Sequence, residues 1–105
     1  MFDELSIMTS FFAEFVHTDN GVTCSDSGFM DLSTAQECSD AVSYAKTFNS
    51  KANYRFEVEF DLNPNGCYME LSKKYPRLEG NMYFNQHSTG SRCSSCISIC
   101  LKSST

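Results

Sequence analysis

The sequence predicts a small α+β domain in which an antiparallel sheet packs against one helix and disulfides join the two. Three observations lead to this prediction. Six of the 105 residues are cysteines, apolar and charged residues alternate over residues 54–62, and apolar residues recur at helical spacing over residues 34–47. These features predict, in turn, covalent cross-links, a half-buried strand and a helix with one buried face.

The cysteines indicate the compartment in which the protein folds. A chain of 105 residues has room for one domain with a small core. An even number of cysteines in such a chain is typical of an oxidising compartment, where each disulfide stabilises the fold by about 2–4 kcal/mol. The candidates are Cys24, Cys38, Cys67, Cys93, Cys96 and Cys100. Six cysteines allow 15 pairings, so composition leaves the connectivity open.

Residues 54–71 are predicted to form a β-hairpin. Over residues 54–62 the alternation would place one set of side chains on a core and the other in water. The segment 63–66, Asn-Pro-Asn-Gly, has the residues that a type I turn followed by a glycine bulge prefers. Tyr68 and Glu70 would then lie on one face of the return strand. The opposite face would carry Cys67, Met69 and Leu71.

Residues 34–47 are predicted to form the helix. Ser33 or Thr34 would be the N-cap, and Gln36 or Glu37 would close a capping box. The buried stripe would consist of Ala35, Cys38, Val42 and Ala45. Cys38 would therefore point toward the sheet.

Two further strands and two disulfides complete the predicted fold. Residues 82–85 are rich in aromatic side chains, and residues 96–101 alternate, so we expect a third strand and a last, edge strand there. Because the helix stripe and the inward face of the return strand should meet, Cys38–Cys67 is the first disulfide expected. Cys24 is expected to pair within the C-terminal cysteine cluster, with Cys100 preferred to Cys93.

Residues 1–20 are treated as a segment separate from the disulfide-stapled module of residues 21–105. Apolar residues recur at helical spacing in this segment, which either completes the core of the domain or docks on a partner protein. The candidate docking residues are Phe2, Leu5, Phe12 and Phe15.

The charge distribution restricts the class of partner. Residues 1–45 contain eight acidic residues and no lysine or arginine, whereas residues 46–105 contain eight basic and five acidic residues. Nucleic acid or an anionic membrane would require a basic face, so neither is expected as a partner. No apolar run reaches the length of a membrane span, and residues 1–4 have acids where a signal peptide has bases. A secreted or lumenal protein would then be a mature form or part of a longer chain.

No group of residues predicts an enzyme, and we expect no cofactor. Glu57, Glu59 and Asp61 alternate onto one strand face, which is usually the wet side of a sheet. The spacing of Cys93 and Cys96 is that of redox dithiols, but those precede a helix, and a strand is predicted here. A zinc site is the alternative for this region. Its ligands would be His87, Cys93, Cys96 and Cys100.

Binding is the remaining class of function. Flat aromatic rings near amide side chains recognise sugars or peptides. The ligand-stacking candidates are Tyr68, Tyr75 and Tyr83, with amides from Asn81, Asn85 and Gln86.

Five short motifs resemble those of a small cysteine-rich module in predicted extracytoplasmic proteins of marine microalgae, dinoflagellates and stramenopiles among them. They are Gly21-Val22-Thr23-Cys24, Ala35-Gln36-Glu37-Cys38, Pro64-Asn65-Gly66-Cys67-Tyr68, Met82-Tyr83-Phe84-Asn85 and the cluster from Cys93 to Cys100. The closing cluster lacks the Cys-Ile-Cys ending of that module, and residues 1–20 lie outside the pattern. The resemblance implies a disulfide-stapled extracellular or lumenal fold and assigns no catalytic residue.

These observations predict a non-enzymatic protein-interaction module, or an accessory subunit of an extracytoplasmic or organelle-lumen assembly. A carbohydrate-binding module is the first alternative, and a zinc-binding or thiol-redox protein is the second.

Overall fold

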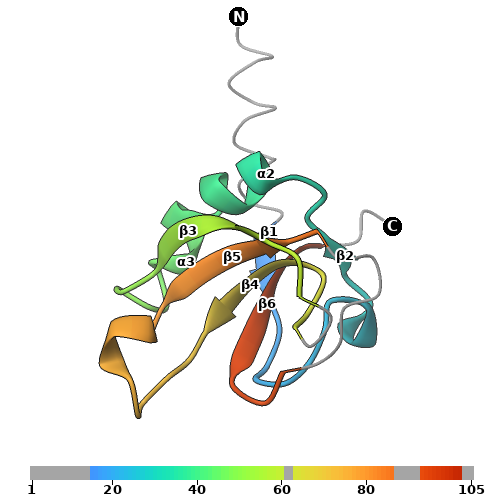
Figure 1. The fold of residues 1–105 in the computed structure, drawn as a ribbon. Coiled ribbons are helices and arrows are strands. Elements are labelled where there is room, and N and C mark those ends of the chain that lie inside the picture. Colours follow the sequence, from blue (N-terminus) through green and yellow to red (C-terminus); the bar gives the residue numbers. More distant parts are fainter. Residues whose placement is uncertain (1–14, 61–62, 87–92, 103–105) are drawn as a thin grey trace, which may run out of the picture.

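The computed structural model describes residues 15–60, 63–86 and 93–102. They form a six-stranded mixed sheet in the order β1-β6-β4-β5-β3, and β2 pairs with β6 as well. The strands are β1 (Phe15–His17), β2 (Met30–Asp31), β3 (Asn53–Val58), β4 (Gly66–Glu70), β5 (Asn81–Asn85) and β6 (Cys96–Leu101). The helices α2 (Ala35–Asp40) and α3 (Val42–Ala45) lie on one side of this sheet, as Figure 1 shows. The α+β, disulfide-rich fold is thus confirmed.

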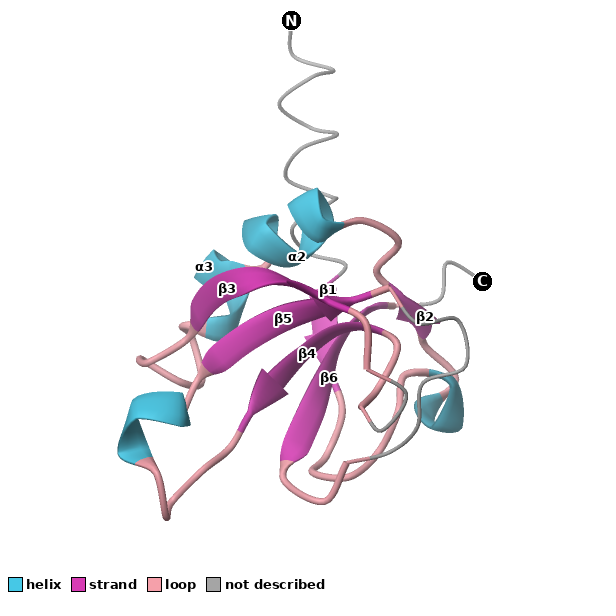
Figure 2. Ribbon diagram, in the orientation of Figure 1, coloured by secondary structure: helices cyan, strands magenta, loops and turns pink. Residues whose placement is uncertain are grey.

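The helical segment is divided in two rather than continuous over residues 34–47. Its start is confirmed: Thr34 is the N-cap of α2, and its side chain and that of Glu37 form the capping box. At Ala41 the backbone has φ −75° and ψ −5°, which separates α2 from α3, although the amide of Ala45 still donates to the carbonyl of Ala41. Two 3-10 turns, η1 (Ser25–Ser27) and η2 (Pro76–Leu78), lie in the connections drawn in Figure 2.

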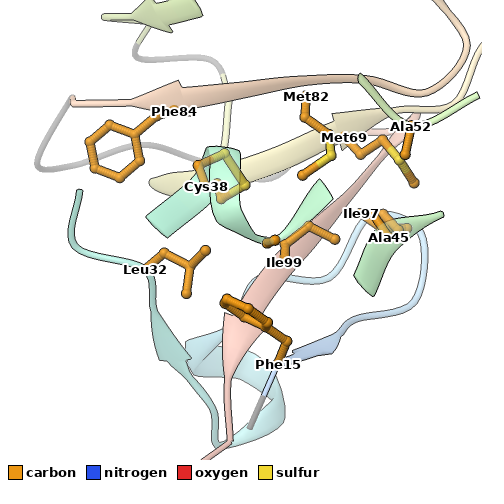
Figure 3. Close-up of a cluster of buried hydrophobic side chains, with 12 residues drawn as sticks. Phe15, Leu32, Cys38, Ala45, Ala52, Met69, Met82, Phe84, Ile97 and Ile99 are labelled. Atoms are coloured by element: carbon orange, nitrogen blue, oxygen red, sulfur yellow. A yellow bond between two sulfur atoms is a disulfide. The ribbon is translucent and has the colours of Figure 1, made fainter. Parts of the chain in front are cut away.

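The main core lies between the sheet and these two helices. Cys38, Ala41 and Ala45 of the helical segment are completely buried. The small alanines let the helices approach the large side chains of the central strands. Those side chains include Met69, Met82, Phe84, Ile97 and Ile99, shown with the rest of the cluster in Figure 3.

Three disulfides connect the elements, and no cysteine is free. Cys38–Cys67 joins α2 to β4, and Cys24–Cys100 joins the start of η1 to β6. These are the two pairs that the sequence analysis placed first. The third disulfide, Cys93–Cys96, closes a short loop in front of β6.

The predicted hairpin is wrong, because β5 lies between β3 and β4. β4 pairs antiparallel with β5, and β3 pairs parallel with the other edge of β5, so the sheet is mixed. Burial explains this order. The residues of β4 from Gly66 to Met69 are all buried and therefore require a neighbour on each side, whereas β3 carries the exposed charges of Arg55 and Glu57, which suit an edge.

The position predicted for the last strand is also wrong. β6 is an inner strand that pairs with β4 on one side and with β1 on the other. β1 and β2 both pair with Leu101 and Cys100, so they occupy opposite edges of β6, and β2 continues the line of β4. A strand with neighbours on both sides is buried, which agrees with the burial of residues 96–100.

Gly80 lies in the turn that leads into β5, and substituting it tests how closely this turn packs against the neighbouring chain. Its φ is +84°, and an added Cβ would lie 2.5 Å from the carbonyl oxygen of Lys51. Gly28 has a similar φ of +77° but no atom within 4 Å of an added Cβ. We expect Gly28→Ala to cost about 1 kcal/mol of unfolding free energy, from backbone conformation alone, and Gly80→Ala to cost about 3 kcal/mol or more. Urea denaturation of both variants measures the difference, and equal losses would contradict the proposed close approach.

Candidate functional site on the open face of the sheet

The sheet has a second face, opposite the helices, on which aromatic side chains gather. In β4, Cys67 and Met69 belong to the main core, whereas Tyr68 belongs to a separate cluster with Val58 and Cys96. This confirms the predicted alternation of the return strand. Among the described residues, no residue of a helix belongs to this second cluster.

Three aromatic residues form a row across neighbouring strands of this face. Phe56 of β3 lies opposite Tyr83 of β5, and Tyr83 lies opposite Tyr68 of β4. The rings of Phe56 and Tyr83 meet edge to face, with centroids 5.3 Å apart, and those of Tyr68 and Tyr83 are 5.5 Å apart. Such contacts hold the rings in fixed relative positions.

A hollow of about 580 Å³ lies over this row. This volume is within the range of about 300–1,000 Å³ that is usual for small-ligand sites. Phe56 and Phe60 line it and are 54% and 50% exposed, so apolar surface faces solvent there. The full lining is Phe56, Phe60, Asn63, Tyr68, Glu70, Tyr83, Cys93, Ser94, Ser95 and Cys96.

Polar contacts fix the two tyrosine hydroxyls of the hollow. The Asn81 amide donates to the Tyr83 hydroxyl at 3.3 Å. Burial, and to a smaller extent the Glu70 carboxylate, raise the pKa of the Tyr83 phenol. The Asn63 amide donates to the Tyr68 hydroxyl at 3.2 Å. Glu70 is the one ionisable carboxylate among the described lining residues, and no lysine, arginine or histidine is among them.

Burial has a measurable consequence for Tyr68. Desolvation, followed by the nearby Glu70 carboxylate, raises the pKa of the Tyr68 phenol far above its usual range. The folded state therefore holds this proton more tightly than the unfolded state, and the resulting stability is complete below about pH 10 and is lost as the pH rises further. We expect the unfolding free energy to fall between pH 10 and pH 11, and to fall less in Tyr68→Phe. Urea titrations at each pH test this; identical profiles for both proteins would contradict it.

Asn85 positions the loop that carries Phe60 and Asn63. Its amide donates to the carbonyls of Phe60 at 2.7 Å, Asn63 at 3.1 Å and Pro64 at 3.0 Å, and its oxygen accepts from the Phe60 amide at 3.0 Å. Asn85 is 2% exposed, so the sequence-based view of this amide as a ligand contact is wrong. Asn85 thus holds the backbone of two residues, Phe60 and Asn63, that line the hollow.

The Cys93–Cys96 disulfide forms one wall of the hollow, beside the hydroxyl groups of Ser94 and Ser95. The zinc alternative fails for these cysteines, because Cys93 and Cys96 bind each other and Cys100 binds Cys24. The thiolate is the form of cysteine that binds a metal, and a sulfur engaged in a disulfide is not a thiolate. His87, the fourth member of that set, lies outside the described residues.

The structure separates the other candidate residues. Tyr75 is 50% exposed in the loop after β4, does not line the hollow, and lies beneath the ammonium group of Lys74. Phe15 is 3% exposed and packs near Tyr44, so it is a core residue and the docking prediction is wrong for it. The other docking candidates, Phe2, Leu5 and Phe12, lie outside the described residues.

The sequence predicted Tyr68 and Tyr83 as residues of a binding site, but it did not predict Phe56, Phe60 or Glu70 as site residues. The alternation over residues 54–62 predicts that the whole apolar set is buried, although only Val58 of that set is buried among the residues described. The pattern that could have identified the two phenylalanines is the alternation of aromatic with charged residues. Such a pattern suits a strand at the edge of a sheet, where one face is partly open.

Comparisons with protein-family models, curated proteins and solved structures found no match to this chain. Among the residues that the structure describes, no helix is long and apolar enough to span a membrane.

Proposed function

We propose that the protein is a non-enzymatic interaction module of an extracellular or organelle-lumen assembly, and that it binds a partner protein through the hollow on the open face of its sheet. One observation carries the proposal. Phe56 and Phe60 hold half of their surface in water beside the fixed rings of Tyr83 and Tyr68. Surface of this kind is characteristic of the centre of a protein interface, where aromatic anchors dominate the binding energy.

The cross-links support the extracytoplasmic part of the proposal. All six cysteines are paired, and disulfides of this kind persist in oxidising compartments. The disulfides and the main core keep the open face rigid without using its aromatic residues, so a partner would meet a preorganised surface.

The test combines site-specific cross-linking with measured affinities. A photo-reactive phenylalanine analogue at Phe56 should cross-link a protein that can be identified, and the same analogue at Tyr75 serves as a control of similar exposure. With that protein purified, Phe56→Ala should weaken binding by about tenfold or more, and Tyr75→Ala should leave it unchanged. Equal effects of the two substitutions would overturn the proposed surface.

Carbohydrate binding is the second candidate, and the composition of the hollow favours it. The exposed ring of Phe56 faces a site that also contains the Ser94 and Ser95 hydroxyls and the Asn63 amide. Rings and polar groups in one cleft are the usual elements of a sugar site. A glycan array probed with the protein and with Tyr83→Ala distinguishes the candidates: a saccharide bound by the first and lost by the second would establish this function in place of protein binding.

A further inference from the structure

We propose that the hollow receives a cationic side chain, lysine or arginine, of the partner protein. This inference rests on the proposed function and names the chemistry of the contact. It follows from the charge and the ring geometry of the lining.

The charge of the lining is complementary to a cation. Glu70 contributes a carboxylate, and the described lining residues contribute no basic group to neutralise it. Tyr68 and Glu70 are two positions apart in β4, so their side chains lie on the same face of the sheet. Glu70 therefore lines the hollow on the same face as the aromatic row. A carboxylate at one end of a partly enclosed apolar site attracts a positive charge more strongly than a carboxylate in open water does.

The rings provide the second half of a cation site. Phe56 and Tyr83 meet edge to face at an interplanar angle of 67°, and Tyr68 is tilted by 33° from Tyr83. Tyr68 is only 2% exposed and supports the row from within, so the rings that can meet a ligand are those of Phe56 and Tyr83. Cations lie over aromatic faces with favourable energy, and the aliphatic stem of lysine or arginine packs against aromatic surface.

The dimensions of the site favour a side chain that belongs to a protein. The hollow of about 580 Å³ is much larger than one ammonium group needs, so residues flanking the cation would enter with it. Phe56 also belongs to β3, which ends the sheet order, and no described strand pairs with the outer edge of β3. An extended backbone could therefore lie along that edge while its side chain enters the hollow.

One nearby charge opposes a bound cation and supplies a sharp control. Arg55 lies close enough to lower the pKa of the Tyr83 phenol, although burial and Glu70 together raise it. Arg55 is exposed and does not line the hollow. Removing its charge should strengthen the binding of a cation and should have no such effect on a neutral ligand.

The experiment is an NMR titration of the full chain with minimal probes. Nα-acetyl-lysine N-methylamide and its arginine counterpart should shift the amide resonances of Phe56, Glu70 and Tyr83. The norleucine counterpart, which keeps the four-carbon stem of lysine and lacks its ammonium group, should bind at least about fivefold more weakly. Choline is a third arm that represents a free small cation.

Three substitutions link the binding to this site. Glu70→Gln should weaken lysine binding by about fivefold, Glu59→Gln should leave it unchanged as a matched loss of charge, and Arg55→Ala should strengthen it by about twofold. Norleucine binding as tight as lysine, choline binding without lysine binding, or no response to Glu70→Gln would each overturn the inference. If the probes fail while cross-linking at Phe56 still identifies a partner whose affinity depends on Phe56, the inference fails and the proposed function stands.

Discussion

Replacing both Cys24 and Cys100 by alanine should lower the unfolding free energy by about 4.5 kcal/mol. This is the stabilisation expected from a disulfide that closes a loop between residues 76 positions apart. This disulfide ties the first 3-10 turn to the inner strand β6, and both cysteines are almost completely buried. The total stability of a small domain is about 5–15 kcal/mol, so the variant should lie close to the threshold of folding at 37 °C.

The matched control is the double variant Cys93→Ala/Cys96→Ala. Its cysteines are three positions apart, and the same relation gives a loss of only about 1.6 kcal/mol. Thermal unfolding followed by circular dichroism compares the two variants with the parent chain. A larger loss from the short loop than from the long one would show that chain entropy is not what these bonds contribute. Thiol titration of the denatured parent chain without reductant should find no free thiol.

Asn85→Asp should cost about 3 kcal/mol or more at pH 7. The substitution replaces a donor to three backbone carbonyls by a buried carboxylate that faces the same oxygens. The loop carrying Phe60 and Asn63 should loosen, so the resonances of those two residues should change most. Asn81→Asp is the control. Its amide makes two long contacts, at 3.3 Å to Tyr83 and 3.5 Å to Arg77, and its loss should cost less than about 1 kcal/mol.

The pH dependence of this variant has a definite sign. A carboxyl group surrounded by carbonyl oxygens retains its proton more readily in the folded protein than in the unfolded chain, so its folded pKa lies above about 3.9. The variant should therefore recover stability relative to the parent as the pH falls from 7 to 4. A destabilisation that stays constant over this range would mean that the carboxylate has escaped to solvent and that the loop has already opened.

Local sequence was sufficient for the features that depend on neighbours in the chain. The capping box needs only Thr34 and Glu37, which are three residues apart, and the alternation of β4 follows from the geometry of any strand. The Cys38–Cys67 disulfide was also within reach, because these cysteines had to lie on the buried faces of a helix and a strand that pack together.

The pairing of strands was not within reach of such reasoning. A turn sequence between two alternating segments predicts a hairpin, but Asn63 to Gly66 belong to a wider loop that is held by the side chain of Asn85, more than twenty residues later. Likewise, Phe56 and Phe60 look like core residues in sequence. Phe56 is exposed because β3 lies at the edge of the sheet and its side chain is on the face without helices, and Phe60 lies in the loop that follows β3.

The sequence by itself determined the class of fold, the helix start and the faces of β4, because each depends on short spacing or on composition. It ranked Cys38–Cys67 and Cys24–Cys100 first among the possible cross-links, and the tertiary structure decided between the pairings. The tertiary structure alone decided that β5 separates β3 from β4, that β6 is an inner strand, and that Phe56, Tyr83, Tyr68 and Glu70 share one hollow. The physical reason is that sheet order is chosen by the total burial of all strands together, and no segment of the chain contains that information alone.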